Sequence, residues 1–201
     1  MQNRIRRSAI GLLAFATALG LAAQSAAPPS PPLGEAQQRV ETAVSTAMSK
    51  QRISGLSIAV AMDGRPRWSQ GYGFADIENS VPFTAGTVWR LGSISKPITA
   101  VAAMQLVERG RIDLDAPIQK YCPAFPEKEK PITSRQLLGH LSGIRHYAPN
   151  ENFNSTHHYE GVVASLESFK KDTLLHPPGA SYTYSTYGYV VLGCVVEGAS
   201  G

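Results

Sequence analysis

A nearly continuous apolar segment between Ser93 and Arg109 restricts the fold of this chain more than any other feature. Polar positions within it are few and scattered, and its larger apolar residues recur at helical spacing: Ile94, Ile98, Val101, Met104 and Val107. A helix that is apolar on most of its sides is a buried helix. We therefore expect a buried helix here, and Gly110 is placed to end it.

A helix and a hairpin are predicted before this segment. Residues 35–51 carry apolar side chains on one helical face. Residues 56–62 alternate as in a strand, Asp63-Gly64 is typical of hairpin turns, and residues 67–73 read as the returning strand. Because two strands alone are marginally stable in water, we expect other strands to complete the sheet. Three further helices are predicted, at residues 134–141, 161–172 and 187–198.

The first 34 residues have the layout of an export signal. They contain no acidic residue, and a basic start is followed by an apolar run at residues 9–23 and a small-residue cleavage site. We expect a signal peptide at residues 1–25, a Pro-rich spacer at 26–34 and a folded domain at 35–201. The predicted location is periplasmic or secreted, with a mitochondrial presequence as the alternative. The apolar run is shorter than a bilayer span, so no stable membrane span is expected.

The composition is that of a soluble globular protein, with 43% hydrophobic and 17% charged residues. The chain has 19 basic and 15 acidic residues, but three of the basic residues (Arg4, Arg6 and Arg7) belong to the predicted signal. Without them the charges nearly balance. The basic isoelectric point therefore gives no reason to expect a nucleic-acid partner.

The apolar segment begins with a Ser-x-x-Lys pattern, Ser93 to Lys96. Residues three apart on a helix share one face, so the hydroxyl and the amine are expected within reach of each other. A neutral amine can take the proton of a serine hydroxyl and make it a nucleophile, and burial favours the neutral form. The alternative is an N-cap serine beside a surface lysine.

The same pattern occurs again at Ser168 to Lys171, which shows how easily it arises. That copy lies among charged residues and is expected to be solvated and without catalytic function. The pattern alone therefore does not decide between an enzyme site and a helix cap.

Several ordered motifs do decide. The stretches Arg90 to Pro97, Leu137 to Ile144, Pro178-Gly179 and Tyr184 to Tyr189 together resemble the serine β-lactamase and penicillin-binding-protein superfamily, in the branch of class C β-lactamases, D-aminopeptidases and related esterases. Residues 121–129 and 144–147 are similar to the mitochondrial serine β-lactamase-like members. The resemblance covers about residues 38–201.

The resemblance implies an α+β fold (an α/β sandwich) of the β-lactamase/transpeptidase-like type, with an antiparallel sheet flanked by helices and a helical subdomain. It also implies roles for individual residues: Ser93 matches the acylated nucleophile, Lys96 its activating base and Tyr184 a proton shuttle. Thr186 is the implied substrate-binding residue, at a position where many relatives have Asn. The alternative for Tyr184 is a half-buried tyrosine without catalytic function.

The third motif of these relatives, K-[ST]-G or H-x-G on a later strand, does not occur in this sequence. We interpret the short strand inventory and this absence together as a C-terminally truncated domain whose C-terminal strands are missing in this chain. The implied function is a serine hydrolase that cleaves an amide or ester through an acyl-enzyme. The alternative is a catalytically impaired β-lactamase-like binding or self-assembling scaffold.

The remaining candidates weigh less. Cys122 and Cys194 could pair in an oxidising compartment, but a loop cysteine and a buried helix cysteine favour free thiols. The five histidines have no metal-ligand spacing, so no metal and no cofactor are expected. The expected partner is a small-molecule or peptide-like substrate, with a possible homo-oligomer. The kind of substrate (peptide, D-amino-acid amide, ester or β-lactam), the oligomeric state and any continuation of the chain beyond Gly201 stay open.

Overall fold

The computed structural model describes residues 34–149, 151 and 155–201. It divides into two compact units, one ending at Val88 and one comprising Trp89–Gly201. The predicted signal peptide (residues 1–25), and all of the predicted spacer (26–34) except Gly34, lie outside the described residues. Within the described ranges, every helix is too short or too polar to cross a membrane.

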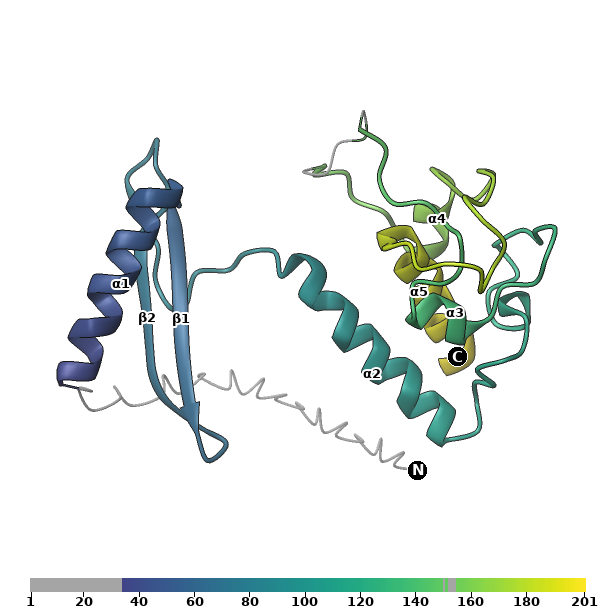
Figure 1. Ribbon diagram of the computed structural model, residues 1–201, viewed down its shortest axis with the longest axis horizontal. Helices are drawn as coiled ribbons and strands as arrows, with labels where there is room; N and C mark the ends of the chain where they lie inside the picture. Colours follow the sequence, from purple (N-terminus) through teal and green to yellow (C-terminus); the bar gives the residue numbers. More distant parts are fainter. Residues whose placement is uncertain (1–33, 150, 152–154) are drawn as a thin grey trace, which may run out of the picture. The chain divides into compact units, whose positions relative to one another are not determined.

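The first unit is a helix against an antiparallel sheet. Helix α1 (Glu35–Gln51) has the predicted bounds and precedes strands β1 (Gly55–Met62), β2 (Arg65–Asp76) and β3 (Val81–Pro82), which form the sheet in the order β1-β2-β3. The predicted hairpin turn is confirmed, because Asp63 and Gly64 join β1 to β2 with φ values of 52° and 71°. Helix α1 runs along this hairpin (Figure 1). Among residues 34–88 of this unit, the buried side chains are Val44 and Trp68.

The second unit is mainly helical. Its elements are the 3-10 turn η1 (Gly92–Ile94), α2 (Ser95–Glu108), the 3-10 turn η2 (Ile118–Lys120), α3 (Ser134–Leu138), α4 (Val162–Leu166) and α5 (Thr186–Ser200). Helix α5 contacts α2, α3 and α4 and is therefore the centre of the core. The fully buried core side chains include one residue or more from most elements: Ala103, Ile118, Leu137, Leu166, Val191, Leu192 and Val195.

The prediction that α2 is buried on most of its sides is wrong for the helix as it lies in the second unit. Only Ala103 and Leu106 of the helix are buried. On the opposite side Ile98 and Val101 are 58% and 59% exposed. The sequence specifies which faces of a helix are apolar, whereas burial depends on the elements that cover each face.

The helix predicted at residues 161–172 is also shorter than expected, since α4 ends at Leu166. The chain then turns, and Phe169 enters the core. Lys128 Nζ donates to the backbone carbonyls of Lys170 and Asp172 at 2.7 and 2.8 Å. These two bonds tie the segment after α4 to a distant loop.

The two cysteines form a disulfide, so the expectation of free thiols is wrong. Cys122 and Cys194 are 72 residues apart in sequence, with Cα atoms 5.5 Å apart. Both are buried within the core. The bond joins the loop after η2 to the middle of α5. Spacing in the sequence could not predict it, because the loop reaches α5 only through the tertiary packing.

Two glycines of α5 provide a matched test of how closely the helix packs on that loop. A Cβ added to Gly198 would lie 1.8 Å from the Tyr121 carbonyl oxygen, whereas one added to Gly193 would lie 3.7 Å from Val162 Cγ1. We expect Gly198→Ala to lower the free energy of unfolding by about 1–3 kcal/mol through overpacking. Gly193→Ala should raise it by ~0.5–1 kcal/mol, because alanine favours a helix. Urea unfolding measures both, and equal effects of the two changes would contradict the packing.

Candidate active site

Ser93 lies in η1, the 3-10 turn that leads directly into α2, and its side chain is exposed. The preceding Gly92 adopts a φ of 56°, a backbone conformation that residues with a side chain rarely adopt. The turn thus requires glycine at that position and presents the Ser93 hydroxyl at the surface where α2 begins. The tetrad is therefore not a simple N-cap, because Ser93 lies in the 3-10 turn that precedes the helix.

Lys96 lies in the first turn of α2 and is partly buried. Its Nζ donates to Ser93 Oγ at 3.2 Å and to Thr186 Oγ1 at 3.1 Å. The predicted contact between the amine and the hydroxyl is thus present. The amine is held between two hydroxyls rather than extended into solvent.

Tyr184 completes the group from a segment that is distant in sequence. Its hydroxyl lies 2.7 Å from Ser93 Oγ, and Lys96 Nζ lies 4.9 Å from the centre of its ring. Hydrogen bonding from Lys96, followed by that from Ser93, lowers the pKa of the Tyr184 phenol. Tyr184 is 37% exposed, so the group is open on one side.

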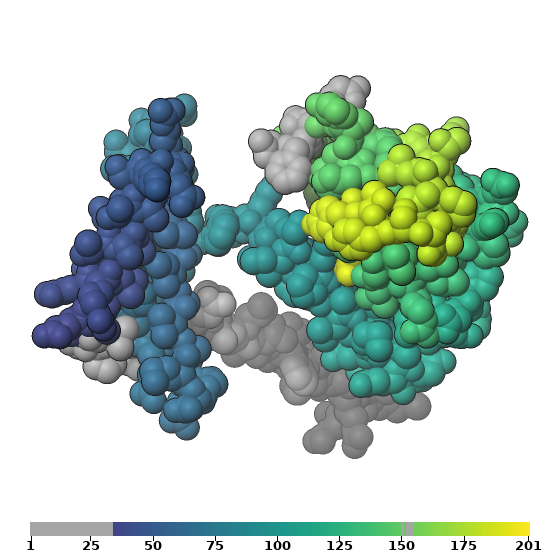
Figure 2. Space-filling view, viewed as in Figure 1, coloured from purple at the N-terminus to yellow at the C-terminus, as the bar shows by residue number. Residues whose placement is uncertain are grey.

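The start of α5 fixes Tyr184 and Thr186. Ser185 is the N-cap residue of α5 and is almost fully buried. Its Oγ accepts from the Gly188 amide at 2.8 Å and donates to the Arg145 carbonyl at 2.9 Å. This one side chain therefore begins the helix and attaches it to the loop after α3. Those two stretches lie side by side on the surface of the second unit (Figure 2).

Two histidines that the sequence did not indicate as functional also belong to this group. The rings of His140 and His146 lie 4.6 and 5.4 Å from the Tyr184 ring, centre to centre. Burial, and then the charge of Lys96, lowers the pKa of both imidazoles. Their spacing matches no catalytic or metal motif. The only signal that could have found them is that they lie within two of the stretches that carry the family resemblance.

The second Ser-x-x-Lys pattern differs in its lysine. Ser168 Oγ donates to the Ser165 carbonyl at 3.1 Å and also lies beside the Tyr187 phenol, but Lys171 is exposed. The two patterns are therefore identical in sequence but differ in their surroundings. Tyr184 and Thr186 contact Ser93 and Lys96, whereas Lys171 is exposed.

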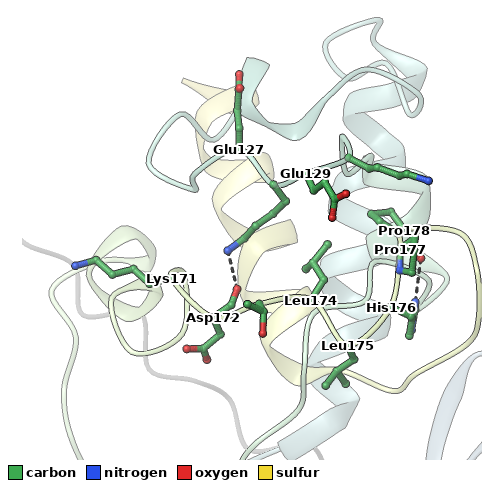
Figure 3. Close-up of a pocket in the computed structure, with 12 residues that line it drawn as sticks. Glu127, Glu129, Lys171, Asp172, Leu174, Leu175, His176, Pro177 and Pro178 are labelled. Atoms are coloured by element: carbon green, nitrogen blue, oxygen red, sulfur yellow. Dashed lines mark hydrogen bonds between the residues drawn. The ribbon is translucent and has the colours of Figure 1, made fainter.

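A cavity of about 610 Å³ lies elsewhere in the second unit, between residues 127–130 and 171–178 (Figure 3). None of the four candidate residues lines it. Lys128 Nζ donates to the Asp172 carbonyl at 2.8 Å and so joins the two segments that line the cavity. We assign it no role in the chemistry of Ser93. Among the described residues, no three His, Cys, Asp or Glu side chains are grouped so that they could hold a metal ion.

The arrangement of Ser93, Lys96 and Tyr184 suits proton transfer at a hydroxyl. Ser93 Oγ has an amine at 3.2 Å and a phenol at 2.7 Å, and either the neutral amine or the ionised phenol could take its proton. A reacting carbonyl carbon could approach from the exposed side. The geometry is that of a serine nucleophile with adjacent proton carriers.

An ion-pair network supports the loop behind this group. Arg145 contacts Glu151 through both terminal nitrogens, at 2.8 and 3.0 Å, and Asp172 through Nε at 2.6 Å. Tyr187, in the first turn of α5, donates its hydroxyl to Glu151 at 2.9 Å. Hydrogen bonding from Arg145 lowers the pKa of the Glu151 carboxyl from its ordinary 4.5 to about 2.

This network predicts an acid-sensitive contribution to stability. Because the pKa of Glu151 is lower in the folded state, its contribution is complete above about pH 4.5 and is lost as the pH falls toward 2. We expect a loss on the order of 2 kcal/mol, allowing for the partial exposure of the carboxylate. Urea unfolding at pH 2–6 measures it. Glu151→Gln should make the free energy of unfolding less dependent on pH in that range. The same pH dependence in the variant as in the wild type would contradict the assignment of the effect to Glu151.

The chain is similar to known proteins over nearly all of the described residues. The family model described as Beta-lactamase matches residues 40–201. The human protein "Serine beta-lactamase-like protein LACTB, mitochondrial" is 34% identical over 215 residues, which cover 73% of this chain and 39% of that protein. The chain thus spans about two fifths of the length of this curated relative.

Solved structures show the same fold. "EstCE1, a hydrolase with promiscuous acyltransferase activity" superposes with a TM-score of 0.70 at 29% identity, covering 82% of this chain and 47% of that one. The "octameric penicillin-binding protein homologue from Pyrococcus abyssi" superposes with a TM-score of 0.67 at 30% identity, covering 82% and 39%. These matches confirm the predicted α+β, β-lactamase-like fold class. Because the family model matches residues 40–201, most of this chain, the chain belongs to the Beta-lactamase family.

Proposed function

We propose that the protein is a serine hydrolase that cleaves an amide or ester of a peptide-like or other small substrate through an acyl-enzyme on Ser93. The observation that carries the proposal is the contact of Ser93 Oγ with both Lys96 Nζ and Tyr184 OH, at 3.2 and 2.7 Å. Few structural roles would bring an amine and a phenol together on one exposed hydroxyl.

The proposed reaction has two steps. Ser93 Oγ attacks the carbonyl carbon of the substrate while its proton passes to Lys96 or Tyr184, and that proton then leaves with the amine or alcohol of the substrate. A water molecule next attacks the ester carbonyl on Ser93 and gives its proton to the same groups. The bond between the acyl carbon and Ser93 Oγ breaks, Ser93 takes that proton back, and the acid is released. The backbone N–H of Ser93 would stabilise the negative oxygen that forms in each step.

Thr186 also contacts the amine that would carry the proton. Its hydroxyl accepts from Lys96 Nζ at 3.1 Å, so it orients the amine in the absence of a substrate. Its role as a substrate-binding residue stays a prediction. Many relatives have a longer carboxamide at this position, which would contact the amide of a penicillin-like substrate. The shorter hydroxyl of Thr186 therefore favours other substrates.

We also propose that the protein is exported. The layout of residues 1–34 and the disulfide between Cys122 and Cys194 support this independently, since disulfides persist in oxidising compartments. Mass spectrometry of the mature protein from its source tests the proposal. Cleavage near residue 25 and no free thiol are expected, whereas an intact N-terminus with two free thiols would contradict it.

The test of the catalytic proposal is covalent labelling. A fluorophosphonate probe should label the full-length protein, and peptide mapping should place the label on Ser93. Ser93→Ala should abolish labelling, while Ser168→Ala, the matched change in the second Ser-x-x-Lys pattern, should leave it unchanged. Labelling that survives Ser93→Ala would overturn the assignment.

A scaffold function is the second candidate, favoured by one observation: a structural relative is described as octameric. Light scattering of the wild type and of Ser93→Ala separates the two functions. A scaffold assembles equally well with or without the hydroxyl, and it shows no labelling of Ser93. Wild-type protein that is labelled at Ser93, with a mass that shows no assembly in either form, supports the enzyme.

A further inference from the structure

Two histidines hold the backbone that carries Tyr184 and Thr186. The amide of Ser185 donates to His140 Nδ1 at 3.1 Å, and the amide of Thr186 donates to His146 Nδ1 at 3.3 Å. Because a backbone N–H can only donate, both Nδ1 atoms are acceptors. Each ring is therefore neutral and carries its proton on Nε2.

The same two rings also contact the phenol. Tyr184 packs against His140 and His146 with ring centres 4.6 and 5.4 Å apart. Its position is thus determined twice, through its ring and through the backbone on its C-terminal side. A shift of either histidine would move the phenol relative to Ser93, whose Oγ lies 2.7 Å from the Tyr184 hydroxyl.

We propose that His140 and His146 are positioning residues whose neutral rings hold Tyr184 against Ser93, so that protonation of either ring releases the segment and slows acylation. The proposal rests on the proposed function of Ser93 as the nucleophile. Protonation would place a proton on Nδ1 opposite an N–H, which replaces a hydrogen bond with two donors facing each other.

The surroundings of the rings favour the neutral form. Burial and the charge of Lys96 lower the pKa of His140, and the same two effects outweigh the opposing charge of Glu151 at His146. Both rings also face the start of α5, where the helix dipole disfavours a cation. The effect is therefore expected below pH 6.5, the ordinary value for histidine. Besides the rings themselves, the charged and titratable groups around the pair are Lys96, Arg145, Glu151, Tyr147, Tyr182, Tyr184 and Tyr189.

The first test needs no activity. NMR of the ¹⁵N-labelled full-length protein should show His140 and His146 with bare Nδ1 atoms at pH 7. On acidification, the amide signals of Ser185 and Thr186 should shift with the same midpoints as the two rings. The ring of exposed His158 is the internal control, and the two amides should not follow its signals. Protonated Nδ1 atoms at pH 7, or amides that ignore the ring titration, would overturn the proposal even if Ser93 proves to be the nucleophile.

The second test uses variants at His146. His146→Asn keeps an acceptor near Nδ1 but cannot titrate, so it should label within about threefold of wild type at pH 7.5 and lose the part of the acid decline that tracks the ring. His146→Phe keeps a ring without the acceptor and should label about tenfold more slowly than wild type at pH 7.5, as for the loss of one hydrogen bond. That difference should shrink at acid pH, where the wild-type ring becomes protonated. His158→Asn should match wild type.

The outcomes of the two tests are separable. Equal pH profiles for wild type, His146→Asn and His146→Phe would overturn the positioning role. Absence of any labelling in the wild type would refute the proposed function, and the NMR titration would then decide alone whether the histidines hold the segment. Thermal unfolding of each variant shows whether slow labelling comes from an altered site or from an unfolded chain. If a variant is unfolded, the NMR titration of the wild type decides whether the histidines hold the segment.

Discussion

Replacing Lys96 with methionine is expected to slow fluorophosphonate labelling of Ser93 by about 100–10,000-fold, the usual contribution of a general base. Methionine has nearly the length of lysine but cannot take a proton. Lys96 Nζ lies 3.2 Å from Ser93 Oγ and 3.1 Å from Thr186 Oγ1, so the change removes both contacts and leaves the helix intact. Labelling rates of purified protein, measured by gel fluorescence over time, provide the readout.

The chain supplies its own control for this experiment. Lys171→Met makes the same change in the second Ser-x-x-Lys pattern, where the lysine is exposed, and should leave the rate unchanged. Circular dichroism of both variants tests whether they are folded. A Lys96→Met protein that labels within threefold of wild type would assign the base to Tyr184 instead, and Tyr184→Phe would then be the variant that loses labelling.

Loss of the disulfide is expected to have the largest effect on stability. In the chain-entropy account, a bond between residues 72 positions apart stabilises the folded state by about 4 kcal/mol. The double variant Cys122→Ala, Cys194→Ala should lose about that amount, because the unfolded chain regains its freedom and two buried sulfurs leave the core. Urea unfolding of the wild type and the double variant measures the difference.

A reducing agent provides the control. It should lower the urea midpoint of the wild type toward that of the double variant and leave the double variant unaffected. The same midpoint for oxidised and reduced wild type would show that the bond contributes nothing to stability.

Local structure was largely predictable from the sequence. Helix α1, the β1–β2 hairpin and its Asp63-Gly64 turn arise from short-range patterns of apolar residues and turn residues, and the structure has them where expected. Errors arose where distant segments compete. Helix α4 ends at Leu166, short of its predicted end, and the segment after it packs Phe169 into the core and is held by Lys128 from a distant loop.

The candidate site was predictable only in part. Ser93 and Lys96 are neighbours through the helical repeat, so their contact could be expected from spacing alone. Tyr184 and Thr186 could be assigned to the same site only through family resemblance, because no local rule joins positions about 90 residues apart. Neither the spacing nor the family resemblance assigned His140 and His146 to the site.

By itself, the sequence determined the elements and the residue types available for chemistry: a hydroxyl and an amine one turn apart, an apolar helix behind them, and a tyrosine at the start of the last helix. Tertiary structure alone decided that the lysine of one Ser-x-x-Lys pattern is held between two hydroxyls beside a phenol while the other lysine is exposed, that Cys122 pairs with Cys194, and that two histidines cap the backbone next to Tyr184. The reason is physical. Propensity and periodicity act over a few residues, whereas contacts between distant segments depend on how the whole core packs.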